Sequence, residues 1–398
     1  MKMVEIKKLS NPIKEYSWGS QEAIPDLLSL KKDGKPRAEL WMGTHPSAPS
    51  VVLNEDGTKE TLDKLIAGNP EFFLGSGIAG EFSNTLPFLF KLLAVEKPLS
   101  IQAHPDRKRA KAGFDEEEKK KIPLDAGCRN YKDRNHKPEL ILALTPFYAM
   151  CGFRNYGDIV NDFSILDFTP LSGSLRALKT DPSEKYLREF FKKIMELGDS
   201  EKKSLVNSLF RIKKKLSVEQ GFWIERLNVE YPEDIGVVCP LLLNIVLLEP
   251  GEALFLSEGI LHSYLQGFGV EIMANSDNVI RGGLTPKHVD VQELITMLKF
   301  SSHDVKKVIP EIESGCEKIY SVPVRDFLLS EIALSSNDIF KSRINHSFEI
   351  LLCVKGRVEI FSGNDSISVS RGESVFIPFS VENYFIKGEG RIFKAGIP

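Results

Sequence analysis

The stretch LSIQAHPD, residues 99–106, places two side chains of the metal-ligand type, Gln102 and His104, two positions apart. In an extended strand, side chains at positions i and i+2 point to the same face. The amide oxygen and the imidazole nitrogen would then approach one point, and Pro105 ends regular strand pairing directly after them. This pattern indicates either one half of a metal site or two polar residues on a solvated strand face.

A second segment with ligand chemistry is NHKPEL, residues 135–140. Because Lys137 and Glu139 are two positions apart, their side chains point to the same face of a strand, whereas the side chain of His136 points to the opposite face. Pro138 favours an edge strand or a bulge, so the parity argument is looser here. The carboxylate of Glu139 is an anionic ligand that zinc accepts beside nitrogen donors.

The third segment is GEALFLSEGILHSYL, residues 251–265, which has an apolar strand, a Glu-Gly turn and a second strand that carries His262. One glutamine, two histidines and one glutamate form a nitrogen and oxygen donor set without thiolate. Such a set suits Zn²⁺, with Mn²⁺ or Fe²⁺ as alternatives. With room left for a substrate, the site would be catalytic rather than structural.

Composition excludes several other classes of protein. The chain has 398 residues, which favours two or three domains, and a net charge of −3, which provides no general basic field for nucleic acid. The first residues lack the apolar segment of a signal peptide, and apolar runs such as residues 240–248 are too short to cross a bilayer. Five scattered cysteines without a CxxC pair predict free thiols in a reducing cytoplasm and exclude a thiolate zinc site.

A central block, residues 154–235, has the period of α-helices rather than strands. Asp181 and Pro182 supply an N-cap and a proline at the first helical position, and Gly198 ends the apolar helical pattern that follows. The aromatic side chains of the block are therefore predicted to form its core. Residues 86–95, by contrast, form an apolar run typical of a strand buried on both faces.

An internal repeat relates residues 251–265 to residues 372–386, because the same Gly-Glu-x-x-Phe pattern and the following apolar positions recur at a constant offset. At the position of His262 the second copy has Asn383. Short strands with Gly and Pro turns predict two related jelly-roll barrels of the cupin type, of which only the first binds metal.

The expected fold class is therefore mainly β with an α-helical insertion: two jelly-roll (cupin-type) β-domains plus a helical domain. The expected organisation is a metal-bearing domain of residues 1–153 and 236–300, a helical insertion of residues 154–235, and a C-terminal jelly roll without metal, residues 301–398.

The segment between the two copies carries Glu271, Asp277 and Arg281 in a loop-like region, followed by two glycines that permit close approach of a substrate. Arg281 is interpreted either as a substrate ligand or as one partner of a loop salt bridge. The remaining histidines are predicted to lie outside the metal site. His45 is predicted as a turn residue and His288 as a surface residue, and His303 and His346 have no ligand-type neighbours.

Four motifs together resemble the type I mannose-6-phosphate isomerase family: QAHPD (102–106), NHKPE (135–139), HSYLQGFGVEIMANSDNVIRGGLTPKHVD (262–290) and NPIKEYSWGS (11–20). The resemblance runs through nearly the whole chain, including the helical insertion and the trailing barrel. It implies a zinc-bearing cupin domain, a helical domain and a second jelly roll. It also implies the reversible interconversion of mannose 6-phosphate and fructose 6-phosphate.

The resemblance also implies roles for individual residues. One zinc ion per chain would be held by Gln102, His104, Glu139 and His262. Arg281 would be essential near C1 and C2, Lys137 would be an acid–base group and His136 a ring-opening group. The phosphate would contact Ser100 and Lys287, and the pocket would be lined by Glu271 and Trp18.

Aldose–ketose isomerisation moves a proton between C2 and C1 through a cis-enediol, so it needs a base, a group that stabilises oxyanion charge, and a positioned open-chain sugar. The base stays open among Lys137, His136, Glu271 and a zinc-bound water. Competing interpretations are another metal-dependent cupin enzyme, such as an iron oxygenase, and a non-catalytic sugar-phosphate-binding protein. The fourth ligand Gln102 disfavours the oxygenase.

We expect a cytoplasmic monomer with a small sugar phosphate as its partner. We expect it to bind neither nucleic acid nor a membrane.

Overall fold

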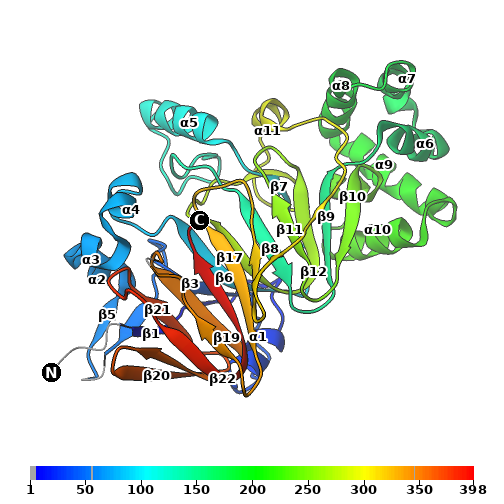
Figure 1. Cartoon of the computed structure of the whole chain (residues 1–398). Coiled ribbons are helices and arrows are strands. Elements are labelled where there is room, and N and C mark those ends of the chain that lie inside the picture. Colours follow the sequence, from blue (N-terminus) through cyan, green and yellow to red (C-terminus); the bar gives the residue numbers. More distant parts are fainter. Residues whose placement is uncertain (1–5, 55–56, 345) are drawn as a thin grey trace.

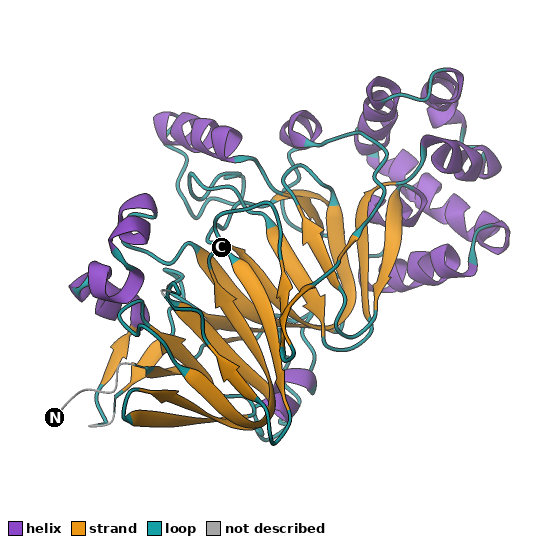
Figure 2. Ribbon diagram, in the orientation of Figure 1, coloured by secondary structure: helices purple, strands orange, loops and turns teal. Residues whose placement is uncertain are grey.

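Two large β-sheets and one block of helices make up the computed structural model, which describes residues 6–54, 57–344 and 346–398 (Figures 1 and 2). The helical block lies at one end, next to the metal-bearing sheet, and the C-terminal sheet lies at the other end. The predicted fold class, mainly β with a helical insertion, is confirmed.

The metal-bearing sheet is built around one long strand, β12 (His262–Ala274). Its second half pairs with β6 (Phe88–Val95) and β8 (Glu139–Ala143), and its first half pairs with β9 (Phe147–Phe153) and β7 (Ile101–Ala103). Every residue of β6 is buried, as its mainly apolar run predicts. The sheet is completed by β2 (Ile13–Lys14), β3 (Glu39–Met42), β10 (Leu243–Leu248), β11 (Ala253–Leu256), β13 (Ile280–Gly283) and β14 (Lys307–Val308).

The C-terminal sheet contains strands from both ends of the chain. From the C-terminal part come β15 (Glu311–Ser314), β16 (Glu317–Tyr320), β17 (Leu328–Leu334), β18 (Ile339–Lys341), β19 (Glu349–Ser362), β20 (Asp365–Ser370), β21 (Ser374–Ile377) and β22 (Phe385–Gly396). From the N-terminal part come β1 (Lys7–Ser10), β4 (Val51–Leu53) and β5 (Lys59–Thr61), which join through the pairing of β1 with β21. These three strands thus cover an edge of the C-terminal sheet, although they lie in the segment that the sequence assigns to the metal-bearing domain.

The internal repeat is visible as two equivalent groups of three strands. β11 and β12 both pair with β8, and β21 and β22 both pair with β19. Gly251 and Gly372 begin the two copies and both have positive φ, at +93° and +86°, a conformation that favours glycine. β8 and β19 are therefore corresponding strands of the two barrels.

The helical block consists of five α-helices, named here in chain order: α6 (Tyr156–Leu166), α7 (Ser172–Thr180), α8 (Glu184–Met195), α9 (Asp199–Ile212) and α10 (Val218–Glu230). Three short 3₁₀ turns accompany them, η1 (Thr169–Leu171), η2 (Lys213–Lys215) and η3 (Ile235–Leu241). Phe190, Phe191 and Trp223 are fully buried in one apolar cluster with the adjacent sheet. These aromatic residues form the core of the block, as predicted, whereas Phe210 and Phe222 are exposed.

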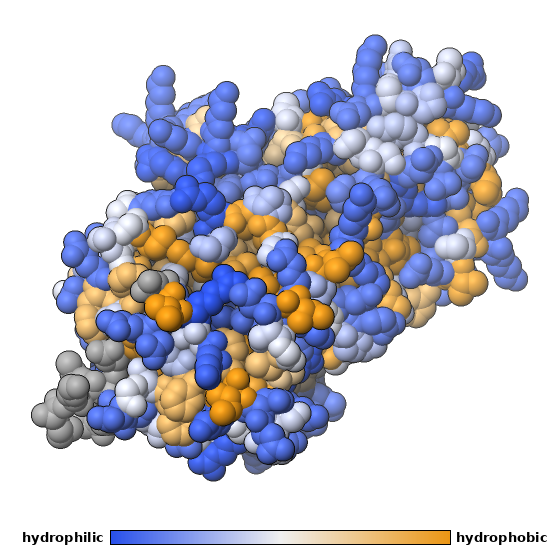
Figure 3. All heavy atoms as spheres, in the orientation of Figure 1, coloured by the Kyte–Doolittle hydropathy of each residue, from blue (hydrophilic) through white to orange (hydrophobic). Residues whose placement is uncertain are grey.

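The other helices lie at the borders of the sheets: α1 (Ala23–Leu27), α2 (Leu62–Gly68), α3 (Pro70–Leu74), α4 (Ser76–Glu81), α5 (Arg107–Lys119) and α11 (Val291–Met297). Hydrophilic side chains cover α5 on the face drawn in Figure 3. Within the described ranges, no helix combines the length and the apolar character that crossing a membrane requires.

Candidate active site

His104, Glu139 and His262 converge at one end of the metal-bearing sheet. His104 follows β7, Glu139 begins β8 and His262 begins β12. The Nε2 atom of His104 lies 3.2 Å from Oε1 of Glu139, and Nε2 of His262 lies 3.5 Å from the other carboxylate oxygen. All three side chains are almost completely buried. Their ligand atoms are close enough to one another to hold one metal ion.

The two imidazoles have the orientation of metal ligands. Nδ1 of His104 donates to the carbonyl oxygen of Asn278 at 2.7 Å, and Nδ1 of His262 donates to that of Ile260 at 2.9 Å. Both Nε2 atoms are buried and have no hydrogen-bond partner among the described residues. Burial lowers the pKa of His104 to about 4, which keeps its ring neutral. Two unpartnered imidazole nitrogens beside a carboxylate fit Zn²⁺.

Gln102, the fourth predicted ligand, lies in β7 directly opposite His262. On its other side β7 pairs with β13, where Gln102 lies opposite Arg281. The side chain is half-buried and lines the same cavity as Glu139. The sheet register therefore brings the four predicted ligands and Arg281 to one place, although they come from four separate segments.

A cavity of about 930 Å³ opens beside this cluster. Its volume is in the range of small-molecule sites. Most of the predicted site residues line it, namely Trp18, Ser100, Gln102, Lys137, Glu139, Glu271, Arg281 and Lys287. The structure thus brings the predicted substrate-binding residues together around the ligand cluster.

His136 is the predicted site residue that the structure brings neither to the ligand cluster nor to the wall of this cavity. Its Nδ1 atom contacts Oε1 of Glu258 at 2.7 Å, and its Nε2 atom contacts Oδ2 of Asp326 at 2.9 Å. Burial lowers the pKa of His136, but the hydrogen bonds to these carboxylates outweigh burial and raise it to about 9. The physical reason for its position is strand parity, because Lys137 and Glu139 take the face that lines the cavity.

A buried ion pair in the cavity was not predicted from the sequence. Nζ of Lys91 lies 2.6 Å from Oε2 of Glu271, and both side chains are buried. Burial lowers the pKa of Lys91, but the carboxylate of Glu271 outweighs burial and holds it above its usual value. Lys91 is the single charged residue in the apolar run of β6, and that isolation was a usable signal, because a charge in a strand buried on both faces needs a partner.

Arg281 and Lys287 form a cationic end of the cavity. Within the described ranges, neither side chain forms an ion pair, although both line the cavity. The positive charge of Arg281 lowers the pKa of Lys287, so the two cations lie close enough to repel each other. Two adjacent cations without carboxylate partners favour a bound anion such as a phosphate group.

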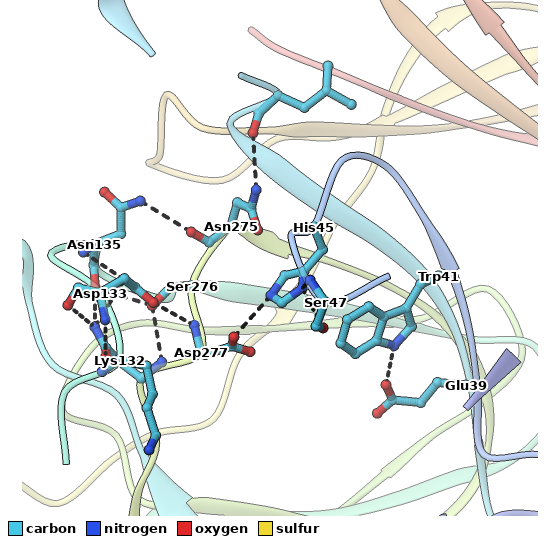
Figure 4. Close-up of polar contacts among 12 residues, drawn as sticks. Glu39, Trp41, His45, Ser47, Lys132, Asp133, Asn135, Asn275, Ser276 and Asp277 are labelled. Carbon is cyan, nitrogen blue, oxygen red and sulfur yellow. Dashed lines mark hydrogen bonds and ion pairs between the residues drawn. The ribbon is translucent and has the colours of Figure 1, made fainter. Parts of the chain in front are cut away.

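Two loops beside the metal cluster are joined by hydrogen bonds to Asp133 (Figure 4). Its carboxylate accepts from the Ser276 hydroxyl at 2.8 Å and from the backbone N–H of Asp277 at 2.8 Å. Asp277 also contacts Nε2 of His45 at 3.2 Å. His45 was predicted as a turn residue with no partner at ligand spacing, and it does begin a turn, because the backbone N–H of Ala48 donates to its carbonyl oxygen at 3.0 Å. Its ring is buried and connects the β3 segment to this loop.

Asn278 links the two ligand-bearing segments directly. Its side-chain oxygen accepts from the backbone N–H of Lys132 at 2.7 Å, and its side-chain nitrogen donates to the carbonyl oxygen of Asn135 at 2.8 Å. Its own carbonyl oxygen orients the ring of His104. Asn278 is completely buried, and sequence patterns did not identify it because its partners are distant backbone atoms.

We expect Asn278→Ala to weaken zinc binding roughly 10- to 100-fold, the usual cost of disturbing the outer partners of metal ligands. The substitution keeps the backbone carbonyl that orients His104, but it removes the side-chain hydrogen bonds that fix the segment before Glu139 and hold that carbonyl in place. Competition with a chromophoric chelator measures the affinity. Asn275→Ala is the matched control in the same loop, because its side chain makes only a 3.5 Å contact with Leu86. Equal zinc affinity in both variants would contradict this role.

Comparison with known proteins gives consistent matches along the chain. A model of the phosphomannose isomerase type I catalytic domain matches residues 6–156. A model of the helical insertion domain of the same family matches residues 171–243. A model of the mannose-6-phosphate isomerase cupin domain matches residues 317–395. The first match covers strands of the metal-bearing sheet together with β1, β4 and β5, the second covers most of the helical block, and the third lies in the C-terminal sheet.

Curated relatives and solved structures extend over nearly the full chain. Mannose-6-phosphate isomerase of Escherichia coli (strain K12) is 40% identical over 97% of this chain and 98% of its own length. The Homo sapiens enzyme of the same name is 36% identical over 93% and 92%. The crystal structure of mannose 6-phosphate isomerase from Salmonella typhimurium bound to fructose 6-phosphate and zinc has a TM-score of 0.90 and 37% identity, covering 99% of this chain and 100% of that chain.

Proposed function

Because the chain belongs to the type I phosphomannose isomerase family and has mannose-6-phosphate isomerase activity, we propose that it interconverts mannose 6-phosphate and fructose 6-phosphate by moving a proton between C2 and C1 through a cis-enediol. The observation that carries this proposal is the buried cluster of His104, Glu139 and His262 beside a cavity with an unpaired cationic end. The ligand cluster at one end of the cavity suits a metal ion, and the cationic residues at the other end suit a phosphate.

In this proposal one Zn²⁺ is held by Gln102, His104, Glu139 and His262. The bound ion supplies Lewis-acid polarisation and orientation of sugar oxygens. The two imidazoles support this assignment, because their Nδ1 atoms are already engaged and their Nε2 atoms are free.

Arg281 stabilises the negative charge that develops on the oxygens at C1 and C2. Its position opposite Gln102 in the sheet places it beside the ligand cluster, and its guanidinium donors are not taken up by a carboxylate in the described part of the chain. Lys287 and Ser100 bind the phosphate. The electrostatic contact between Arg281 and Lys287 supports this order of sites along the cavity.

Lys137 transfers the proton. Its side chain lines the cavity, and its Nζ atom lies 3.0 Å from Oε1 of Glu139. Among the other candidates, Glu271 has its carboxylate engaged by Lys91 at 2.6 Å. His136 takes no part in the chemistry, because its ring is held by carboxylates outside the cavity.

The test of this mechanism is isomerisation in D₂O followed by NMR, which reports deuterium entering C1 or C2 of the sugar. We expect Lys137→Ala to slow both turnover and isotope exchange by on the order of 10² or more, the usual contribution of a positioned acid–base group. Lys97→Ala is the matched control, because Lys97 also lines the cavity but pairs with Glu230 at 3.0 Å. Unchanged exchange in Lys137→Ala would contradict the role of Lys137 as the base.

We expect Lys287→Ala to raise KM roughly tenfold with kcat nearly unchanged. The phosphate does not react, so its contacts are equally strong in the ground state and the transition state, and one charge-assisted hydrogen bond at an exposed site contributes about 1.5 kcal/mol. Steady-state kinetics with mannose 6-phosphate measure the effect, and unphosphorylated mannose is the control substrate whose kcat/KM should not change. A fall in kcat at constant KM would contradict the assignment to phosphate binding.

We also propose that the enzyme works as a monomer in the cytoplasm. All five cysteines are free thiols, as expected for a reducing compartment. The cavity and the ligand cluster are built from residues of one chain, so the proposed chemistry needs no second copy.

A further inference from the structure

The ligand-bearing segment NHKPEL, residues 135–140, has a counterpart in the C-terminal barrel, NHSFEI, residues 345–350. Asparagine, histidine and glutamate recur at the same spacing. His346 and Glu349 of this counterpart lie just before and at the start of β19, as His136 and Glu139 do for β8. Residue 345 itself lies outside the described ranges.

Strand register shows that Glu349 occupies the place of Glu139. In the metal-bearing sheet, Glu139 pairs with Leu256 of β11. In the C-terminal sheet, Glu349 pairs with Ile377 of β21, and Ile377 corresponds to Leu256 in the internal repeat. The C-terminal barrel therefore has a carboxylate at the position of a metal ligand.

A second cavity, of about 370 Å³, lies at this end of the C-terminal barrel, between its strands and the α3–α4 segment (Figure 1). Glu349, Glu317 and Lys394 line it. Nζ of Lys394 lies 2.8 Å from Oε1 of Glu317 and 3.3 Å from Oε1 of Glu349. The hydroxyl of Tyr384 donates to the other oxygen of Glu349 at 2.6 Å. The cavity thus contains a buried, organised polar cluster.

This cluster does not have the composition of a metal site. Asn383 stands at the position of His262, and the Lys394 ammonium lies between the two carboxylates. Across the described ranges, the group formed by His104, Glu139 and His262 is the only set of His, Cys, Asp and Glu side chains close enough to hold a metal ion. The composition of this cluster therefore disfavours a metal ion in the second cavity.

Two buried polar atoms of the cavity wall lack partners. Nε2 of His346 and Oγ of Ser347 have no hydrogen-bond partner among the described residues, and His346 is only 8% exposed. A buried polar group without a partner costs about 1–3 kcal/mol. A ligand that offers hydrogen bonds to both atoms would offset that cost.

We propose that the C-terminal barrel holds a second, metal-free site for an uncharged, hydroxyl-rich molecule of monosaccharide size. Hydroxyl groups both donate and accept, so they match carboxylate oxygens, the His346 nitrogen and serine hydroxyls at once. An anion is disfavoured, because two carboxylates face one ammonium and Arg343 at the rim is paired with Glu313 at 2.7 Å. A second cation is disfavoured, because Lys394 already lies between the carboxylates. The inference is independent of the isomerase mechanism.

The test uses the zinc-loaded full chain with D-mannose as the probe and fructose 6-phosphate at saturating concentration to occupy the active site. Saturation-transfer NMR then detects mannose at any other site. We expect saturable mannose binding, weakened at least about tenfold in His346→Phe, which keeps a ring but removes the unpartnered nitrogen. Isomerase kcat and KM should stay unchanged in this variant.

A second variant adds a side chain at the wall of the cavity and leaves the polar cluster untouched. Gly77 of α4 lines the cavity, and an added Cβ there meets no atom within 4 Å. Gly77→Leu is therefore expected to fold normally, as thermal unfolding can verify, and to lose mannose binding. Absence of saturable mannose binding to the unsubstituted protein would overturn the proposal, as would unchanged binding in both variants. Two-site binding of fructose 6-phosphate, with one site lost in His346→Phe, would overturn the uncharged class of ligand.

Discussion

His262→Ala is expected to abolish isomerisation and to lower the zinc content of the purified protein. The substitution removes one of two buried imidazole nitrogens that face Glu139, so the remaining donors no longer complete the site. Loss of an outer partner of a metal ligand lowers metal affinity or activity by up to about 100-fold, and loss of a ligand itself should lower them further. Turnover is measured in metal-depleted buffer, and bound zinc by elemental analysis.

The exposed His288 provides the matched control for this variant, since His288→Ala should retain both zinc and activity. His262→Gln is a second variant that preserves most of the buried volume, and circular dichroism shows whether each protein is folded. Near-normal turnover of folded His262→Ala without added metal would contradict the ligand assignment.

Arg281→Ala is expected to lower kcat by on the order of 10², equivalent to about 2.7 kcal/mol of transition-state stabilisation, while the protein stays folded. The side chain lines the cavity without an ion-pair partner in the described part of the chain, so its removal leaves no buried carboxylate unpaired. Steady-state kinetics separate kcat from KM. Arg281→Lys should restore only part of the activity, because an ammonium cannot reproduce the planar fork of a guanidinium. A raised KM at constant kcat would make Arg281 a binding residue instead.

Much of the metal site is predictable from local sequence. The i, i+2 spacing in QAHPD and NHKPE placed the ligand side chains on one face, and the structure brings Gln102, His104 and Glu139 together with His262. The helical insertion is also predictable, because a 3.6-residue period depends only on neighbouring residues, and α8 lies within the segment predicted between Asp181 and Gly198. The predicted N-cap was wrong, because α8 begins at Glu184 with Ser183 as its N-cap, two residues after Asp181.

Features that depend on long-range register were not predictable. The pairing of Lys91 with Glu271 joins β6 to β12, and nothing in either segment names the other partner. Asn278 holds backbone atoms more than 140 positions away in the sequence. The pairing of β1 with β21 likewise joins opposite ends of the chain, and alternation of apolar residues cannot specify which edge a strand will join.

The most direct measurement is a coupled assay of fructose 6-phosphate formation from mannose 6-phosphate, before chelation, after chelation and after zinc is added back. The account predicts activity that disappears with the chelator and returns with zinc, because the two imidazoles and the carboxylate form the reaction centre together with the adjoining cavity. Absence of activity in protein whose site is fully loaded with zinc would contradict the account.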